Sequence, residues 1–169
     1  MTRIVTPTVN LQRPEPVARS AYKIFRDIQT RWADNDQYGH VNNVVYYSWF
    51  DTAVNGLLIE RGALSQPGFE MSGKNATQSL DQSPTVMGFV VETQCDYFAP
   101  LTFPEPVVLG IRVAHMGRSS VRYELGVFPA DGERLCVAKG HFVHVYVDSA
   151  TRRPVPLPAA LVLVLRTLT

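Results

Sequence analysis

The feature that most constrains this fold is a single long apolar helix between strand-like segments. The pattern predicts a helix over residues 43–61 that ends at Gly62, because glycine readily takes the left-handed conformation that follows many helices. Such a helix has to be buried nearly all round, and among strands this requires a sheet wrapped around it. The apolar residues that cover most of its circumference are Val44, Val45, Tyr46, Tyr47, Trp49, Phe50, Ala53, Val54, Leu57, Leu58 and Ile59.

Segments on both sides of the helix alternate between apolar and polar residues, as half-buried strands do. One strand is predicted from Tyr22 to Trp32. Four more are predicted near residues 86–97, 105–116, 119–128 and 134–147, with Asp131-Gly132 as the hairpin turn between the last two. The order predicts an α+β domain with an antiparallel sheet of about five strands. Residues 63–84 are irregular, and long connections of this kind are often lids or binding loops.

Length and composition fit one globular domain of 169 residues. We expect an arm at residues 1–20, where prolines oppose regular structure, a domain at 21–158, and an apolar segment at 159–169 that packs on the domain. The net charge of +1 argues against binding to nucleic acid or to anionic membranes, and no apolar run approaches the length of a membrane span. The two cysteines, Cys95 and Cys136, lie in apolar strand-like runs, which favours buried free thiols and a cytoplasmic protein.

Candidate chemistry lies where the first strand turns into the helix, in the segment RWADNDQYGHVNNVVYYSWFD at residues 31–51. Backbone N–H groups at a helix start have no partner within the helix, so the N–H of Asn43 can polarise a carbonyl oxygen. Asp36 can attack that carbonyl or activate water, and His40 is a possible second acid–base group. The alternatives are that Asp36 only stiffens the turn and that His40 is a structural donor. Asp34 is expected to accept backbone N–H groups or to pair with Arg31.

The motif in this segment, D-x-D-x-x-G-H-V-N-N-x-x-Y, resembles the signature of the 4-hydroxybenzoyl-CoA thioesterase family of hotdog-fold acyl-CoA thioesterases. Weaker similarities at residues 95–101, 117–120, 145–148 and 153–158 follow in the family's order, so the resemblance covers roughly residues 22–158. It implies a hotdog fold, a sheet wrapped around one long helix. The residues that carry the motif are Asp34, Asp36, Gly39, His40, Val41, Asn42, Asn43 and Tyr46.

The resemblance also implies an activity: hydrolysis of an acyl-CoA to free acid and CoA without a cofactor, with Asp36 as nucleophile or general base. Gly39, Asn42 and Tyr46 are then candidate substrate contacts, and Asn42 or Asn43 is also the expected helix cap. In the family, active sites form between subunits, and a sheet with open edges favours association, so we expect a homodimer or homotetramer.

The nucleotide end of a CoA substrate needs cations and small hydrogen-bonding residues. The turn Gly117-Arg118-Ser119-Ser120 offers both, which makes Arg118, Ser119 and Ser120 the candidate contacts. Arg152 and Arg153, near the end of the last strand, are the second choice.

No metal site is predicted. Residues 34–39 look like the start of a calcium loop, but Tyr38 and Val45 stand where oxygen ligands are needed. His40 has no second histidine or cysteine at zinc-ligand spacing. Two other functions stay open: a hotdog hydratase or dehydratase acting on acyl thioesters, and a protein that binds acyl-CoA without turnover.

Overall fold

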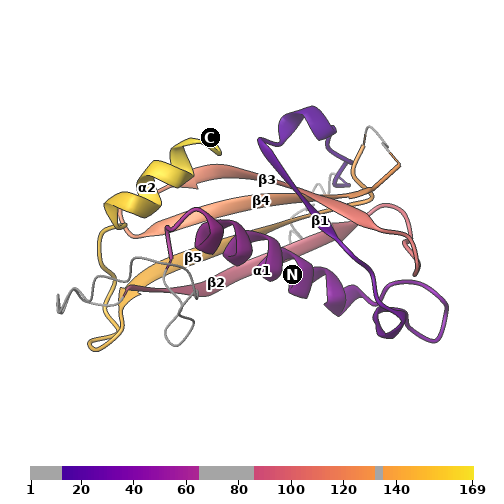
Figure 1. Ribbon diagram of the computed structural model, residues 1–169, viewed down its shortest axis with the longest axis horizontal. Coiled ribbons are helices and arrows are strands. Elements are labelled where there is room, and N and C mark those ends of the chain that lie inside the picture. The colour runs from indigo at the N-terminus through magenta and orange to yellow at the C-terminus, as the bar shows by residue number, and fades with distance from the viewer. Residues whose placement is uncertain (1–12, 65–85, 132–134) are drawn as a thin grey trace, which may run out of the picture.

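One five-stranded antiparallel sheet wraps around one long helix in the computed structural model, which describes residues 13–64, 86–131 and 135–169 (Figure 1). The strand order is β1-β3-β4-β5-β2, so β1 and β2 form the two edges. This confirms the predicted hotdog arrangement. The elements are β1 (Ile24–Ile28), α1 (Asn43–Glu60), β2 (Val86–Tyr97), β3 (Val107–Met116), β4 (Ser120–Pro129), β5 (Ala138–Asp148) and α2 (Ala159–Arg166).

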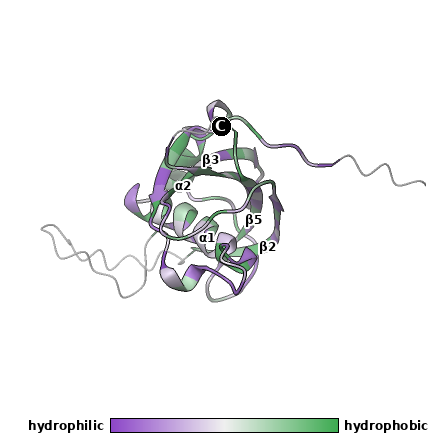
Figure 2. Ribbon diagram, turned by 90° about the vertical axis from the view of Figure 1, so that its right-hand side faces the viewer, coloured by the Kyte–Doolittle hydropathy of each residue, from purple (hydrophilic) through white to green (hydrophobic). Residues whose placement is uncertain are grey.

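Helix α1 lies inside the curve of the sheet, as the end view shows (Figure 2). It ends where predicted, since Gly62 follows with a φ of 67°. Phe50 packs edge-to-face on Phe142 of β5, over Gly140, where a side chain would collide with the Phe50 ring. The prediction of burial nearly all round is wrong for one stripe, because Val44 is 62% exposed. The buried helix residues are Tyr46, Trp49, Phe50, Ala53, Val54, Leu57 and Leu58.

Strand β1 is shorter than predicted and ends at Ile28. The chain then turns into a single 3-10 turn, Trp32–Asp34, because the Asp34 carboxylate accepts the backbone N–H of Arg31 at 2.7 Å. Trp32 was expected in the half-buried strand and is instead 80% exposed. Arg26, on β1, forms an ion pair with Glu60 of α1.

A second, smaller apolar cluster lies on part of the outer face of the sheet, the face away from α1. Tyr22 lies across two paired glycines, Gly110 of β3 and Gly126 of β4. A Cβ atom would lie 2.7 Å from the Tyr22 ring at Gly110 and 2.6 Å from it at Gly126, so only glycine leaves room for the ring. Phe128 meets Tyr22 edge-to-face at 5.6 Å, and buried Cys136 completes the cluster. Both cysteines are free thiols, as predicted, but only Cys136 is buried, and Cys95 is half-buried.

The C-terminal segment forms α2, an amphipathic helix whose Leu161 and Leu165 join the main core. After the helix, the Leu168 carbonyl accepts the N–H of Val113 at 2.8 Å, which ties the chain end to β3. No helix in the described part of the chain is long and apolar enough to cross a membrane. Most of the predicted connection at 63–84, Gly132 of the predicted hairpin turn, and residues 1–12 of the arm lie outside the described residues.

Candidate active site

The turn at Asp36 is closed by its own backbone and by its own carboxylate. The Asp36 N–H donates to the His40 carbonyl at 2.8 Å, and Gly39, with a φ of 81°, donates back to the Asp36 carbonyl at 3.1 Å. Oδ1 of Asp36 accepts the N–H of Tyr38 at 2.8 Å and that of His40 at 3.4 Å. Oδ2 accepts no hydrogen bond from the described residues. One carboxylate oxygen therefore holds the turn, and the other is free for chemistry.

Helix α1 begins directly after this turn. Asn42 is the cap, as predicted among two candidates: its side-chain oxygen accepts the N–H of Val44 at 3.1 Å. The Asn42 N–H donates to the Asp34 carbonyl at 2.8 Å, and the Val41 N–H donates to the Leu101 carbonyl at 2.8 Å. Within the described chain, the N–H of Asn43 has no acceptor. It is therefore the free backbone donor at the helix start.

A cavity of about 400 Å³ brings the turn, the helix start and the end of β2 together. Its wall is partly aromatic, because Tyr46 and Tyr97 meet edge-to-face at 5.0 Å, and burial raises the pKa of Tyr46 to about 12. The Tyr97 hydroxyl donates to the Asn43 carbonyl at 3.1 Å and so ties the helix start to β2. The lining residues are Asp36, His40, Val41, Asn43, Tyr46, Tyr97, Phe98, Ala99 and Pro100.

This cavity unites four of the predicted site residues: Asp36, His40, Asn43 and Tyr46. Gly39 and Asn42 hold the turn and the helix start beside it. The arrangement offers a carboxylate oxygen, a free N–H donor and an aromatic wall. It can therefore hold a carbonyl compound with a donor at its oxygen and an attacking or proton-accepting group nearby.

Asp34 has a structural place, as expected. It is fully buried, and Oδ1 accepts Nε and a terminal nitrogen of Arg31 at 3.0 and 2.8 Å. Its hydrogen bond raises the pKa of Arg31. Oδ2 accepts the backbone N–H of Arg31, so both oxygens of the Asp34 carboxylate accept hydrogen bonds from Arg31.

The predicted nucleotide contacts Arg118, Ser119 and Ser120 are not brought to this cavity within one protomer. Ser120 pairs with Val145 of β5, and Val145 pairs with Phe89 near the start of β2. The cavity lies at the other end of β2, at Tyr97. Eight residues of strand separate Phe89 from Tyr97, about 26 Å at 3.3 Å per residue.

The wall formed by Tyr97, Phe98, Ala99 and Pro100 was missed as part of the site by sequence reasoning. In the sequence, residues 95–101 carry only a weak similarity to the family. Its aromatic residues followed by proline are the signal that could have placed it there: β2 ends at Tyr97, and the Leu101 carbonyl, just beyond Pro100, accepts the N–H of Val41 beside the helix start.

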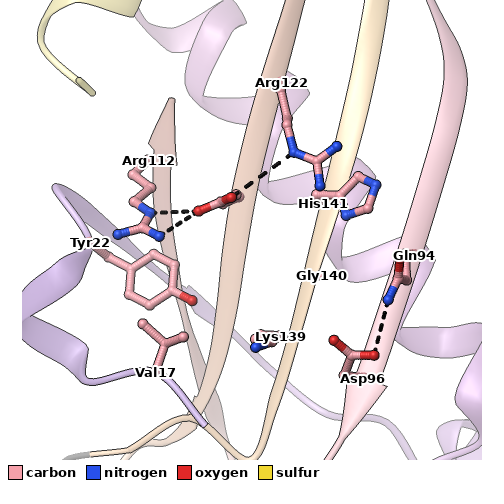
Figure 3. Close-up of a pocket in the computed structure, with 10 residues that line it drawn as sticks. Val17, Tyr22, Gln94, Asp96, Arg112, Arg122, Lys139, Gly140 and His141 are labelled. Atoms are coloured by element: carbon pink, nitrogen blue, oxygen red, sulfur yellow. Dashed lines mark hydrogen bonds and ion pairs between the residues drawn. The ribbon is translucent and has the colours of Figure 1, made fainter. Parts of the chain in front are cut away.

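A second cavity, of about 260 Å³, lies on the outer face of the sheet (Figure 3). Its charges pair across strands: Arg112 binds Glu124 at 2.5 Å, and Arg122 binds Glu92 at 3.2 Å. Nε2 of His141 lies 2.7 Å from the same Glu92 oxygen, and these contacts lower the pKa of Glu92. None of the predicted site residues lines this cavity.

Within residues 13–64, 86–131 and 135–169, no three histidine, cysteine or acidic side chains lie close enough together to hold a metal ion.

Comparison with known proteins gives one family and many related structures. The model of the thioesterase-like superfamily matches residues 30–165. The PA5185 protein of Pseudomonas aeruginosa is 46% identical, with a TM-score of 0.76 over 92% of this chain and 97% of that one. A 1,4-dihydroxy-2-naphthoyl-CoA thioesterase from Synechocystis is 18% identical, with a TM-score of 0.67 over 84% and 94%. A gentisyl-coenzyme A thioesterase is 22% identical, with a TM-score of 0.63 over 84% and 99%. No curated protein matches the chain significantly.

Proposed function

The chain belongs to the thioesterase-like superfamily, and from this premise we propose that it hydrolyses an acyl-CoA to a free acid and CoA. One observation carries the proposal. The free oxygen of Asp36 and the free N–H of Asn43 belong to residues that line a single cavity. A thioester carbonyl placed between them would meet an attacking group and a donor together.

In the proposed reaction, Asp36 attacks the thioester carbonyl carbon or takes a proton from a water molecule that attacks it. The N–H of Asn43 donates to the carbonyl oxygen as negative charge develops there, and such a donor contributes about 2.7–4 kcal/mol. The C–S bond then breaks. The sulfur leaves as CoA thiolate and takes up a proton, for which His40, on the same cavity, is the second acid–base group. In the covalent route, water hydrolyses the acyl-aspartate and frees the acid.

Tyr46 is the proposed contact for the acyl group, since its ring faces the cavity against Tyr97. Gly39 and Asn42 act on the substrate through the geometry of the turn and the helix cap. Within the superfamily we place the chain in the 4-hydroxybenzoyl-CoA thioesterase family, on the motif from Asp34 to Tyr46. The names of two structural neighbours, a dihydroxynaphthoyl-CoA and a gentisyl-CoA thioesterase, make aromatic acyl groups the first to test.

The working unit is proposed to be a homodimer or a tetramer built from it, assembled through β2. This strand is an edge of the sheet, and it carries exposed apolar side chains. Two-fold antiparallel pairing of β2 edges would place the start of one strand beside the end of the other. The Arg118–Ser120 turn of one protomer would then lie toward the Asp36 cavity of the second. The exposed apolar residues of β2 are Met87, Phe89, Val90, Val91 and Tyr97.

Release of free thiol from a panel of acyl-CoAs, with short, long and aromatic acyl groups, tests the proposal. Turnover of any of these thioesters supports it, and the preferred acyl group names the substrate class. A parallel record of enoyl-CoA absorbance detects hydration instead. If purified protein releases no thiol from any member of the panel, the proposal fails.

A further inference from the structure

The cavity on the outer face of the sheet has a row of polar side chains along one side. Gly126 of β4, Lys139 of β5 and Asp96 of β2 are register partners, so they lie next to one another across three neighbouring strands. The Tyr22 hydroxyl lies over Gly126, where a Cβ atom would come within 2.7 Å of it. Figure 3 shows the resulting order, with Lys139 between Tyr22 and Asp96. These three side chains, which we call the polar row, all line the cavity.

Asp96 and Lys139 carry opposite charges on the same face of the sheet, but they form no ion pair with each other. Cross-strand partners of opposite charge normally attract. Here Nζ of Lys139 donates to the Glu15 carbonyl of the arm at 2.8 Å, and Oδ1 of Asp96 accepts the Gln94 amide at 3.1 Å. Oδ2 of Asp96 accepts no hydrogen bond from the described residues, and the ammonium group has further donors to offer. A negative acceptor and a positive donor are therefore both open to a ligand.

The Tyr22 hydroxyl is the third open group. Tyr22 is only 6% exposed, and in the described part of the chain its hydroxyl has no hydrogen-bond partner. Buried hydroxyl groups normally have one. Burial raises the pKa of Tyr22, so the hydroxyl keeps its proton and can donate. The polar row thus has two donors at one end and an acceptor at the other.

The other charged side chains of the cavity already have partners on the sheet. Arg112 binds Glu124, and both Arg122 and His141 contact Glu92. A ligand therefore has to complement only the polar row, with its one negative and one positive charge. A simple anion would leave the carboxylate of the row unpaired beside it, and a simple cation would leave the ammonium unpaired. A ligand that carries both charges close together satisfies the whole row.

The size of the cavity limits the ligand further. Its volume is about 260 Å³, whereas sites for drug-sized ligands have about 300–1,000 Å³. Neighbouring strands lie about 4.8 Å apart, so the row measures about 10 Å from Gly126 to Asp96. A small molecule with an ammonium and a carboxylate group on one carbon atom fits between its ends.

We infer that the outer-face cavity binds a free α-amino acid, with the ligand's ammonium group on Asp96 and its carboxylate on Lys139 and the Tyr22 hydroxyl. This site is separate from the Asp36 cavity, and the inference does not depend on the proposed function. The two sites adjoin, because Nζ of Lys139 lies 5.6 Å from the centre of the Phe98 ring, and Phe98 lines the Asp36 cavity.

The test begins with a panel of L-α-amino acids, screened by their effect on the melting temperature of the full chain. The best ligand is titrated by calorimetry, together with two analogues: the amine that lacks its carboxylate and the acid that lacks its ammonium group. Asp96→Asn keeps an acceptor for the Gln94 amide, and Tyr22→Phe keeps the ring on the two glycines. Asp27→Asn, at an exposed acid of β1 outside the cavity, is the control.

We expect the wild type to bind at least one amino acid, with one molecule per chain. Asp96→Asn should weaken binding by about tenfold or more, since a charged partner is lost, and Tyr22→Phe by about three- to tenfold. Both analogues should bind about tenfold more weakly than the amino acid or worse. Asp27→Asn should bind as the wild type does. In NMR spectra of the wild type, the amide signals of Tyr22, Asp96 and Lys139 should shift on binding.

The inference is overturned if the wild type binds no amino acid of the panel, or if Asp96→Asn binds with wild-type affinity. Equal binding of either analogue would also overturn it, because only one charge would then be recognised. Shifts confined to the residues around Asp36 would place the ligand in the other cavity, with the same consequence. The thiol-release panel decides separately whether the protein is a thioesterase.

Discussion

The Asp36 turn and the outer-face cavity both hold carboxylates, but they use them in opposite ways. On the outer face, Glu124 is bound by Arg112, and Glu92 is shared by Arg122 and His141. Asp36 has no cation within ion-pair distance in the described chain, and one of its oxygens accepts no bond. A paired carboxylate contributes to structure and has its lone pairs engaged. An unpaired one beside a free N–H keeps them for a substrate. The lack of a cation is not sufficient by itself, because Asp96 on the outer-face cavity has none either and is bound by the Gln94 amide; Asp36 differs in sharing its cavity with a free backbone N–H.

The largest effect expected from this contrast is on turnover in Asp36→Asn. The amide keeps an oxygen for the N–H of Tyr38, so the turn should survive, but it cannot attack a thioester or take a proton. We expect kcat to fall by roughly 10²–10⁴-fold, the usual contribution of a positioned acid–base group. Thiol release gives kcat, and circular dichroism checks the fold. Near-wild-type turnover in this variant would show that a group other than Asp36 attacks the thioester or takes the proton.

Asp34→Ala should instead act on stability. It removes a fully buried carboxylate that accepts a backbone N–H and a guanidinium of Arg31. Leaving these donors without their partner should lower the free energy of unfolding by about 2–3 kcal/mol. Urea denaturation measures this, with Asp34→Asn as the variant that keeps an acceptor. Unchanged stability in Asp34→Ala would show that the ion pair between Asp34 and Arg31 does not stabilise the fold.

His144 can be used to test whether a buried side chain without a hydrogen-bond partner is necessarily catalytic. It is buried on the inner face with Nε2 unbonded among the described residues, but it does not line the Asp36 cavity. Burial lowers its pKa, so the unfolded chain takes up a proton first as the pH falls. Its contribution to stability is present above about pH 6.5, the ordinary histidine pKa, and is lost as the pH falls toward the lower folded value.

Unfolding free energies of wild type and His144→Phe between pH 5 and 8 would measure this contribution. The phenylalanine variant should lose less stability as the pH falls, with kcat unchanged. A large drop in kcat would show that an unpaired buried group outside the cavity also serves catalysis.

The smallest effect is expected from Glu124→Gln on the outer face. The Arg112 and Glu124 side chains are 34% and 29% exposed, so water screens their attraction. We expect the free energy of unfolding to fall by only about 0.5–1 kcal/mol, with thiol release unaffected. Calorimetric melting curves of wild type and variant would detect this. Loss of turnover would mean that the outer-face network supports the active site after all.

Most of the fold could be predicted because one long apolar helix is compatible with few architectures. Its apolar circumference required a surrounding sheet, and strict alternation placed β3, β4 and β5 to within a few residues. The end of β1 could not be predicted, because it depends on Asp34 turning back onto Arg31, and alternation continued through Trp32. Val44 was also misplaced, since no pattern within the helix shows which stripe the sheet leaves uncovered.

The candidate site was predictable where it is local in sequence. Asp36, His40 and Asn43 lie within eight residues, and one turn holds them together. The wall at Tyr97 and Pro100 comes from the far end of β2, and only the register of the sheet brings it to the helix start.

The packing of the Tyr22 ring on Gly110 and Gly126 has a practical consequence for anyone who shortens this chain. Tyr22 fills it from outside the sheet, so removing the first 22 residues as a dispensable tail would leave two bare backbone segments facing water. The apolar side of Phe128 would be uncovered at the same time. Truncated versions should therefore begin upstream of Tyr22, and affinity tags are better attached to the arm than substituted for it.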